Sequence, residues 1–397
     1  MMNEQNKNGD YVPVLRWKAA EVDAFYNLEK IVKQQITPMF ELCPVMFIRE
    51  KKVGDNFVKV KLPITVLYKM LIELKSVVGK TPFYMDLKNV DDRNTTYSNQ
   101  SLWESILEYG KFIKLPIIPV TGFYGNGSKN QNLIGSIATE FGNGICIRLF
   151  QKDILRQSFH SDINRLLSML NSTPSHVDLI IDFQFLNNQS ISYTTIENKL
   201  PHIDKWRSIT FLAGSFPENL GHLQANDTYM IPRFEWLKYQ REIISNSPFL
   251  KRIPRFGDYT IQHSIYKEPP DFVNVSASIR YTHNEKWVII RGEALGKEGG
   301  IGYDQYPAEA QLLVEKNEYC GANYSRGDEI IMEKSKNGSN TGTPETWIMI
   351  GINHHVTHTV YQLCPELLEN KVKENTKLQK SEKVQQELWE ASSGKMN

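Results

Sequence analysis

The chain has 397 residues, of which 41% are hydrophobic and 23% are charged, the proportions of an ordinary globular protein. Its 46 lysines and arginines nearly balance its 45 aspartates and glutamates, so no overall basic field predicts nucleic acid or an anionic membrane as a partner. No apolar run approaches the roughly 18 residues that span a bilayer. The four cysteines form no CxxC pair, and the N-terminal segment has no signal-peptide pattern. These features predict a cytoplasmic protein without a membrane partner.

The first two-thirds of the chain alternates short apolar runs with segments of helical periodicity, such as residues 161–170. Strands are expected at residues 11–18, 36–42, 82–88, 114–123, 144–150, 177–185, 208–216 and 253–260. Strands that alternate with helices indicate βαβ units and a parallel sheet. Eight strands in about 250 residues favour a (β/α)8 TIM-like barrel. The alternative is an open, doubly wound α/β sheet followed by a small α+β domain.

The sequence pattern changes after residue 265. Residues 273–295 predict a β-hairpin with a polar turn at His283 and Asn284, and residues 307–316 and 347–363 predict helices. This part forms either a separate α+β domain or an elaboration that caps or completes the barrel, which we favour. The expected divisions are the barrel at 1–265, the hairpin and helices at 266–364, and a charged helical or disordered tail at 365–397.

Charged side chains follow most of the predicted strands, at the end where (β/α)8 barrels carry their working groups. Glu41, Asp86 and Asp182 are acids within apolar runs, where a lone carboxylate is costly to bury. We interpret these three as catalytic acid/base groups or as ligands of Mg²⁺ or another divalent cation. Ion pairs that close the top of the barrel are the structural alternative. The basic strand-end residues that would pair with them or bind a ligand are Lys18, Lys88 and Arg148.

The predicted hairpin and the segment that follows it contain a second group of candidate residues. Arginine and tyrosine on adjacent strands suit an anion flanked by a flat ring, such as a phosphate with its base. The candidate ligand-binding residues in this group are Arg280, Tyr281, Arg291, Gln305 and Tyr306. Protection of an edge strand and aromatic packing between strands would explain the same residues without a ligand.

Three histidines occupy five positions of the predicted helix at 347–363. His354 and His358 would share a helix face, as the two ligands of an HExxH zinc motif do, but His355 stands where that motif has its glutamate. Three interpretations remain open. The cluster binds zinc, or it belongs to a buried helix with hydrogen-bonded histidines. In the third, His354 or His355 reaches the acids at the barrel mouth as a proton donor or phosphate contact.

Several segments, taken in order, resemble the phage-type Beta protein family, the "beta family" proteins of phages and bacterial genomes. They are YVPVLRWKAAEVDAFYNL, ITPMFEL, MDLK, IRYT with WVIIRG, DQYPAEAQLL and GINHHVTH. The similarity extends to about residue 364. It implies a phage or mobile-element setting and a role in phage–host conflict, such as antiviral defence, but it supplies no catalytic residue. The family-typical positions are Lys18, Glu41, Asp86, Arg280, Tyr281, Arg291, Gly292, Gln305, Tyr306, His354 and His355.

Two functions are consistent with these patterns. In the first, a pocket at the barrel mouth binds or processes a phosphate-bearing ligand such as a nucleotide; an enzyme of this kind would be a phosphodiester- or nucleotide-processing hydrolase. In the second, the protein is a non-catalytic accessory module that binds a partner protein of a defence system. Direct binding of nucleic acid is disfavoured because the net charge is only +1.

Overall fold

The computed structural model of the chain describes residues 11–44, 48–53, 56–61, 64–90, 101–124, 130–186, 191–267, 275–296, 301–336 and 338–377. The part of the predicted tail beyond residue 377 lies outside these residues.

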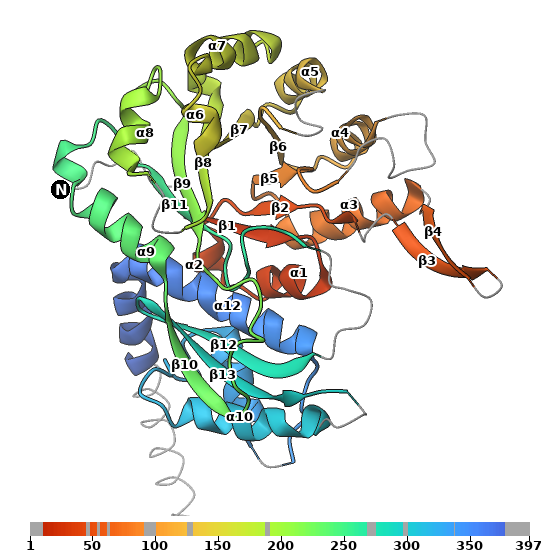
Figure 1. Ribbon diagram of the computed structural model, residues 1–397, viewed down its shortest axis with the longest axis vertical. Helices are drawn as coiled ribbons and strands as arrows, with labels where there is room; N and C mark the ends of the chain where they lie inside the picture. The colour runs from red at the N-terminus through yellow and green to blue at the C-terminus, as the bar shows by residue number, and fades with distance from the viewer. Residues whose placement is uncertain are drawn as a thin grey trace, which may run out of the picture.

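Eight parallel strands close into a barrel, which confirms the predicted (β/α)8 fold (Figure 1). The open-sheet alternative is wrong, because the first strand pairs with both the second and the last. The barrel strands are β1 (Tyr11–Arg16), β2 (Met39–Glu41), β5 (Phe83–Asp86), β6 (Ile117–Thr121), β7 (Ile145–Phe150), β8 (Val177–Phe185), β9 (Ser208–Gly214) and β11 (Arg255–Asp258). Each lies within one of the runs expected from the sequence.

Helices cover the outside of the barrel, as expected from the helical periodicity between the strands. In α3, leucines and a methionine at helical spacing pack inward, and a capping box between Ser101 and Glu104 fixes the start of α4. The helices of this part are α1 (Ala19–Tyr26), α2 (Lys30–Lys33), α3 (Ile64–Val78), α4 (Leu102–Phe112), α5 (Gln131–Phe141), α6 (Gln151–Ile154), α7 (Phe159–Met169), α8 (Tyr193–Lys199) and α9 (Phe234–Tyr239), which continues as the π-helix Gln240–Ile244.

Alternation along the strands divides the barrel core into two layers. Side chains such as Val12, Met39 and Ile180 fill the barrel interior, while their neighbours in sequence pack outward against the helices. Because the interior is filled by these apolar residues, polar side chains that face the axis gather at its two ends. The end at which the strands terminate holds the candidate site.

A second lobe is built on a three-stranded antiparallel sheet in the order β10, β13, β12. The predicted hairpin is confirmed, but its turn lies at Asn284 and Glu285, one residue later than expected, with Asn284 in the left-handed region at φ 49°. The sequence did not reveal β10, which leaves the barrel between β9 and β11 to join this sheet. The lobe comprises β10 (Asp227–Pro232), β12 (Ser276–His283), β13 (Lys286–Ala294), α10 (Tyr306–Val314), α11 (Arg326–Lys334) and α12 (Pro344–Leu363).

Within the second lobe, helix α12 lies next to the barrel, between the barrel and the lobe's sheet (Figure 1). It packs against α1 and β1 on one side and against β12 and α11 on the other. Because both sides are covered, nearly every residue from Ile350 to Tyr361 is buried. A two-stranded hairpin, β3 (Ile48–Val53) and β4 (Asn56–Lys61), projects beside α3 at the right of Figure 1 and was not predicted.

Candidate functional site at the barrel mouth

Three acids predicted from the sequence meet at the carboxyl ends of the barrel strands, around the guanidinium group of Arg148. Its Nη1 donates to Glu41 Oε1 at 2.7 Å and to Asp86 Oδ2 at 2.6 Å. Its Nη2 and Nε donate to Asp182 Oδ2 at 2.7 and 3.0 Å. Glu41 and Asp86 are adjacent because β2 and β5 pair in register at these two residues. All four side chains are buried, so the structure places a fully enclosed ion network here.

The network extends to the groups around it until each carboxylate oxygen has a donor. Lys88 Nζ lies 2.8 Å from Glu41 Oε1, and Asn89 donates to Glu41 Oε2 at 3.1 Å. The backbone N–H of Lys88 donates to Asp86 Oδ1 at 2.8 Å, and that of Gln184 donates to Asp182 Oδ1 at 2.7 Å. The hydroxyl of Tyr259 accepts from Arg148 and donates to Asp182, both at 2.6 Å.

Three carboxylates thus face two cations, Arg148 and Lys88. Burial on its own would raise the pKa of Glu41, but Lys88 and Arg148 outweigh it and hold that pKa well below its usual range. For Asp86 the balance is reversed, because burial raises its pKa against the opposing effect of Arg148, and the charge of Glu41 adds to the rise. Asp86 therefore takes up a proton more readily than Glu41 does.

The residues of this network do not fit a divalent cation. Mg²⁺ and Ca²⁺ need several carboxylate or carbonyl oxygens that converge on one point. Here the guanidinium of Arg148 occupies that point, and the six oxygens of the three acids already accept hydrogen bonds or ion pairs. A metal would have to displace a buried arginine whose own charge the acids neutralise.

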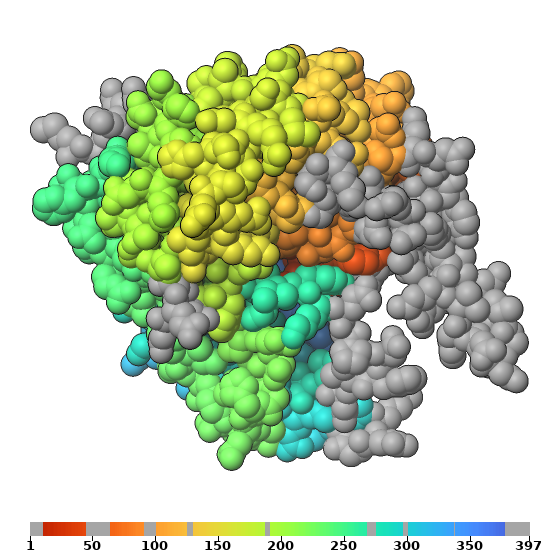
Figure 2. Space-filling model, turned by 45° about the horizontal axis from the view of Figure 1, so that its top comes forward, coloured from red at the N-terminus to blue at the C-terminus, as the bar shows by residue number. Residues whose placement is uncertain are grey.

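A pocket of about 330 Å³ adjoins this network, between the barrel mouth and the second lobe. Its walls are the first turn of α1, the loops after β9 and β11, β12 and the start of α12. Figure 2 shows this face of the molecule, where the blue-green residues that follow β11 lie between the barrel above and the second lobe below. The barrel part of the pocket is therefore formed by the loops after the seventh and eighth strands and by the end of the first.

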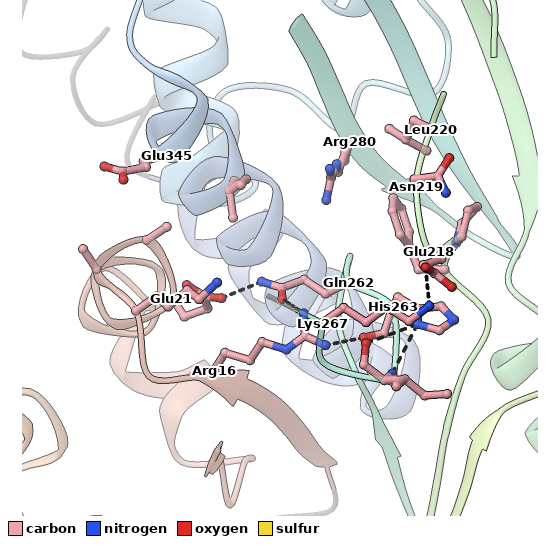
Figure 3. A pocket seen from close by; sticks show the side chains of 17 residues that line it. Arg16, Glu21, Glu218, Asn219, Leu220, Gln262, His263, Lys267, Arg280 and Glu345 are labelled. Atoms are coloured by element: carbon pink, nitrogen blue, oxygen red, sulfur yellow. Dashed lines mark hydrogen bonds and ion pairs between the residues drawn. The ribbon is translucent and has the colours of Figure 1, made fainter. Parts of the chain in front are cut away.

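Three cationic side chains that line this pocket, Arg16, Lys18 and Arg280, are distinct from a fourth, Lys267. Arg16 and Arg280 are labelled in Figure 3, as are the lining acids Glu21, Glu218 and Glu345. Arg16 donates to Gln262 Oε1 at 2.6 Å and to the His263 carbonyl at 2.5 Å. None of the three forms an ion pair with a carboxylate among the residues that the structure describes. By contrast, the pocket residues Lys267 and Glu218 pair with each other at 2.6 Å.

The surroundings of Arg280 disfavour its positive charge, which is an electrostatic strain. Its Nη1 donates to the Ile261 carbonyl at 3.3 Å, and its guanidinium lies 5.1 Å from the centre of the Phe216 ring. Burial, together with the nearby charge of Arg291, lowers the pKa of Arg280 to about 10. An anion in the pocket would relieve this strain. Helix α1 also begins here with no side-chain cap, and Glu21 in its first turn supplies the negative charge that the helix dipole favours at that end.

The other predicted ligand-binding residues lie inside the second lobe and do not line the pocket. Tyr281 donates to Asp328 at 2.7 Å, and Tyr306 stacks on Trp347 with ring centres 5.0 Å apart. The side-chain Oε1 of Gln305 accepts the Glu293 N–H at 2.7 Å. Arg291 donates to the Ala277 carbonyl at 3.3 Å. The predicted ligand-binding residues therefore form three groups. Lys18 and Arg280 line the pocket, and Lys88 and Arg148 join the acids. The remaining residues stabilise the second lobe: Tyr281, Arg291, Gln305 and Tyr306.

The histidines of α12 are buried apart from the acids at the barrel mouth. His355 Nε2 lies 2.9 Å from Asp258 Oδ2, on the outer face of β11, and its Nδ1 lies 2.8 Å from the Thr282 hydroxyl. Burial lowers the pKa of His355 despite the opposing charge of Asp258. His355 thus joins the barrel wall to the second lobe, and the predicted catalytic roles of His354 and His355 gain no geometric support.

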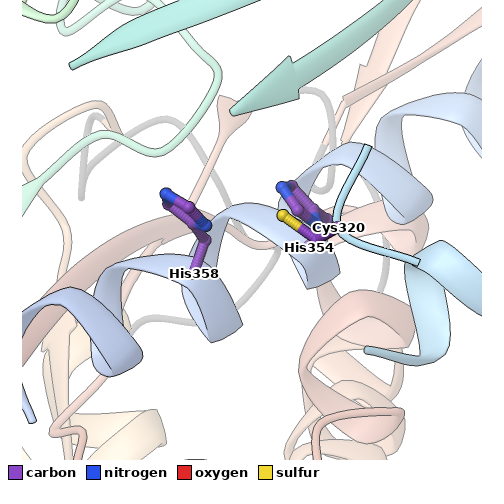
Figure 4. Close-up of side chains that lie close together, drawn as sticks. All are labelled: Cys320, His354 and His358. Atoms are coloured by element: carbon purple, nitrogen blue, oxygen red, sulfur yellow. The ribbon is translucent and has the colours of Figure 1, made fainter. Parts of the chain in front are cut away.

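Cys320, His354 and His358 lie close enough to suggest a metal site (Figure 4). However, His354 Nε2 faces the Thr282 carbonyl at 2.7 Å and its Nδ1 faces Asp328 Oδ2 at 2.8 Å. Both ring nitrogens are thus already engaged by oxygen atoms, and a metal would have to displace one of these buried contacts. The hydrogen bonds of this histidine therefore do not fit zinc.

The second histidine of that group is also engaged. His358 Nε2 accepts the Asn284 N–H at 3.0 Å, so its lone pair is already used, and its Nδ1 lies 2.9 Å from the Tyr324 hydroxyl. Burial lowers the pKa of His358 well below its usual value. These contacts favour the hypothesis of a buried helix with hydrogen-bonded histidines.

The sequence interpretation missed Arg16, Gln262 and His263. Arg16 carried a usable signal, because strict alternation from Val12 and Val14 places it on the interior face at the end of β1. Gln262 and His263 follow the last strand in a loop, where no periodic pattern marks them. Their place in the pocket is set by the packing of that loop against β12.

A closed parallel barrel with a cation-lined pocket at the strand ends defines the chain as a (β/α)8-barrel protein. The model of the Beta protein family matches residues 11–361, and the chain belongs to this family. Among solved structures, the crystal structure of the 3-dehydroquinate dehydratase from Aquifex aeolicus VF5 is similar over 52% of this chain and 79% of that one, at 11% identity. Its TM-score of 0.29 is too low to support any functional transfer.

A search of curated proteins found no match. Among the helices that the structure describes, none combines the length and apolar character needed to cross a membrane.

Proposed function

We propose that this Beta protein binds a phosphate-bearing ligand in the pocket between the barrel mouth and the second lobe. The observation that carries the proposal is that three cations, Arg16, Lys18 and Arg280, line one pocket without a direct ion pair among the described residues, while the Glu21 carboxylate on the same wall offsets part of the charge of Lys18 and Arg16. A partly buried cation without a counterion is destabilising, and a dianionic phosphate would neutralise two such charges at once.

The position of the pocket on the barrel supports the same ligand. In (β/α)8 barrels, phosphate groups frequently bind at the loops after the seventh and eighth strands, next to a helix N-terminus. Here the loops after β9 and β11 and the first turn of α1 supply these parts. The volume of about 330 Å³ falls within the range of small-molecule sites, which begins at roughly 300 Å³.

The proposal is for binding rather than hydrolysis. Glu41, Asp86 and Asp182 are buried, and each of their oxygens is engaged, so none is free to activate water. The hydrolase function and the catalytic roles of these acids therefore remain predictions from the sequence. A role in phage–host conflict is part of the proposal only through the family resemblance, with ligand binding as its molecular basis.

The test is isothermal titration of the full chain with AMP and with inorganic phosphate, comparing wild type with Arg280→Met. A charge-assisted hydrogen bond is worth about 1.5–3 kcal/mol, so the variant is expected to bind AMP at least roughly tenfold more weakly. Its melting temperature should equal or exceed that of wild type, because the substitution removes a cation that burial disfavours.

Arg241→Met is the matched control, because the Arg241 side chain is 77% exposed on the π-helix and does not line the pocket. It should bind AMP like wild type. Absence of binding by wild type, or equal weakening in both variants, would refute the proposal.

A further inference from the structure

An exposed aromatic pair extends the rim of the pocket. His263 lines the pocket, and its ring packs against Phe185 in a tilted arrangement, with centres 4.9 Å apart and planes inclined by 37°. Phe185 is 38% exposed, so one face of the pair is open to solvent or a ligand. His263 Nδ1 lies 3.3 Å from the Ile265 N–H, and its Nε2 has no partner among the described residues. The pair thus offers an aromatic surface and one free polar nitrogen beside the cations.

A distortion of the barrel places Phe185 there. Asp182 on β8 pairs with Leu212 on β9, whereas Phe185 pairs with Gly214, so three steps on β8 oppose two on β9. This extra residue is a β-bulge, and Gln184 within it has a positive φ of 55°. Regular alternation would turn position 185 outward with Phe183, which packs against Phe211. The bulge instead directs Phe185 to the barrel mouth, as bulges beside binding sites commonly do.

We infer that the ligand is a nucleotide, with its phosphate among Arg16, Lys18 and Arg280 and its base on the ring pair of Phe185 and His263. This inference rests on the proposed function, because it assigns the remainder of a ligand whose phosphate occupies the same pocket. A purine or pyrimidine presents a flat π surface to an aromatic side chain, whereas a sugar phosphate has no such surface. This pair differs from ordinary surface aromatics, because a strained bulge holds an apolar ring in an exposed position.

The experiment is isothermal titration of the full chain with AMP, ribose 5-phosphate and inorganic phosphate. Stacking of one base on an aromatic side chain predicts that AMP binds roughly tenfold more tightly than ribose 5-phosphate. Phe185→Leu should reduce the affinity for AMP to that for ribose 5-phosphate and leave the latter unchanged. Phe185→Tyr, which keeps the ring, should preserve the preference.

Phe112→Leu is the control for loss of an exposed aromatic ring, since Phe112 is 79% exposed on α4. It should change neither affinity. Equal binding of AMP and ribose 5-phosphate by wild type would overturn the inference while leaving the proposed function intact, as would an unchanged preference in Phe185→Leu. If none of the three ligands binds, the proposed function fails and the inference fails with it.

Discussion

Replacing Arg148 by methionine tests whether the acid network at the barrel mouth depends on one guanidinium group. The substitution removes donors to Glu41, Asp86 and Asp182 and leaves Lys88 as their nearest cation. Removing one partner of a buried ion pair costs about 3–5 kcal/mol. Three acids lose a partner here, but proton uptake by these acids limits the cost. We therefore expect the free energy of unfolding to fall by roughly 5 kcal/mol, similar to the whole stability of a marginal protein.

Urea unfolding followed by circular dichroism measures this loss. The loss of stability should increase with pH. Without Arg148, the folded protein is most stable when its buried acids are protonated, whereas in the unfolded chain these acids ionise near pH 4 to 5. Adding Asp86→Asn and Asp182→Asn to the Arg148 variant should restore much of the stability, since the uncompensated charges are removed with it. Wild-type stability of the single variant, or no recovery in the triple variant, would refute the electrostatic explanation.

Three further predictions follow from the site and the second lobe. Affinity for AMP should be highest between about pH 6, below which phosphate loses its second charge, and the pKa of Arg280 at about 10. Titration at constant ionic strength measures this window, and an optimum outside it would contradict the prediction. Burial raises the pKa of Glu309 to about 7, and its two oxygens lack partners among the described residues. Wild-type stability should therefore fall as the pH rises through 4.5 to 7, and Glu309→Gln should gain about 2 kcal/mol near pH 8 in urea unfolding, but nothing at low pH. His354→Gln should lose about 1–3 kcal/mol of stability, because buried Asp328 loses one hydrogen-bond partner while Tyr281 and Ser325 still donate to it. EDTA should leave the wild-type melting temperature unchanged; a fall with EDTA would indicate a bound metal.

Some of the candidate site could be predicted from local pattern, and some could not. The ends of parallel barrel strands meet at one edge, so acids at the ends of apolar runs, such as Glu41 and Asp86, had to lie near one another. The same rule named Lys18, Lys88 and Arg148 as candidate partners of these acids, but it did not show which of the three would pair with them, because a run of residues does not reveal which partner its charge will meet. The histidines of α12 illustrate this limit, since their spacing fits zinc while their hydrogen bonds do not fit it.

The sequence by itself determined a parallel sheet, because its eight apolar runs and the helical segments between them leave such a sheet as the main way to bury those runs on both faces. The number of strands favoured a closed barrel over an open sheet, and the pairing of β1 with both β2 and β11 decided it. It also determined that charged side chains would gather at the strand ends. Only the tertiary structure decided which of them form a closed network and which face a pocket. That decision depends on contacts between distant segments, such as Arg16 with the loop after β11, and on the bulge at Gln184. Periodicity carries no information about either.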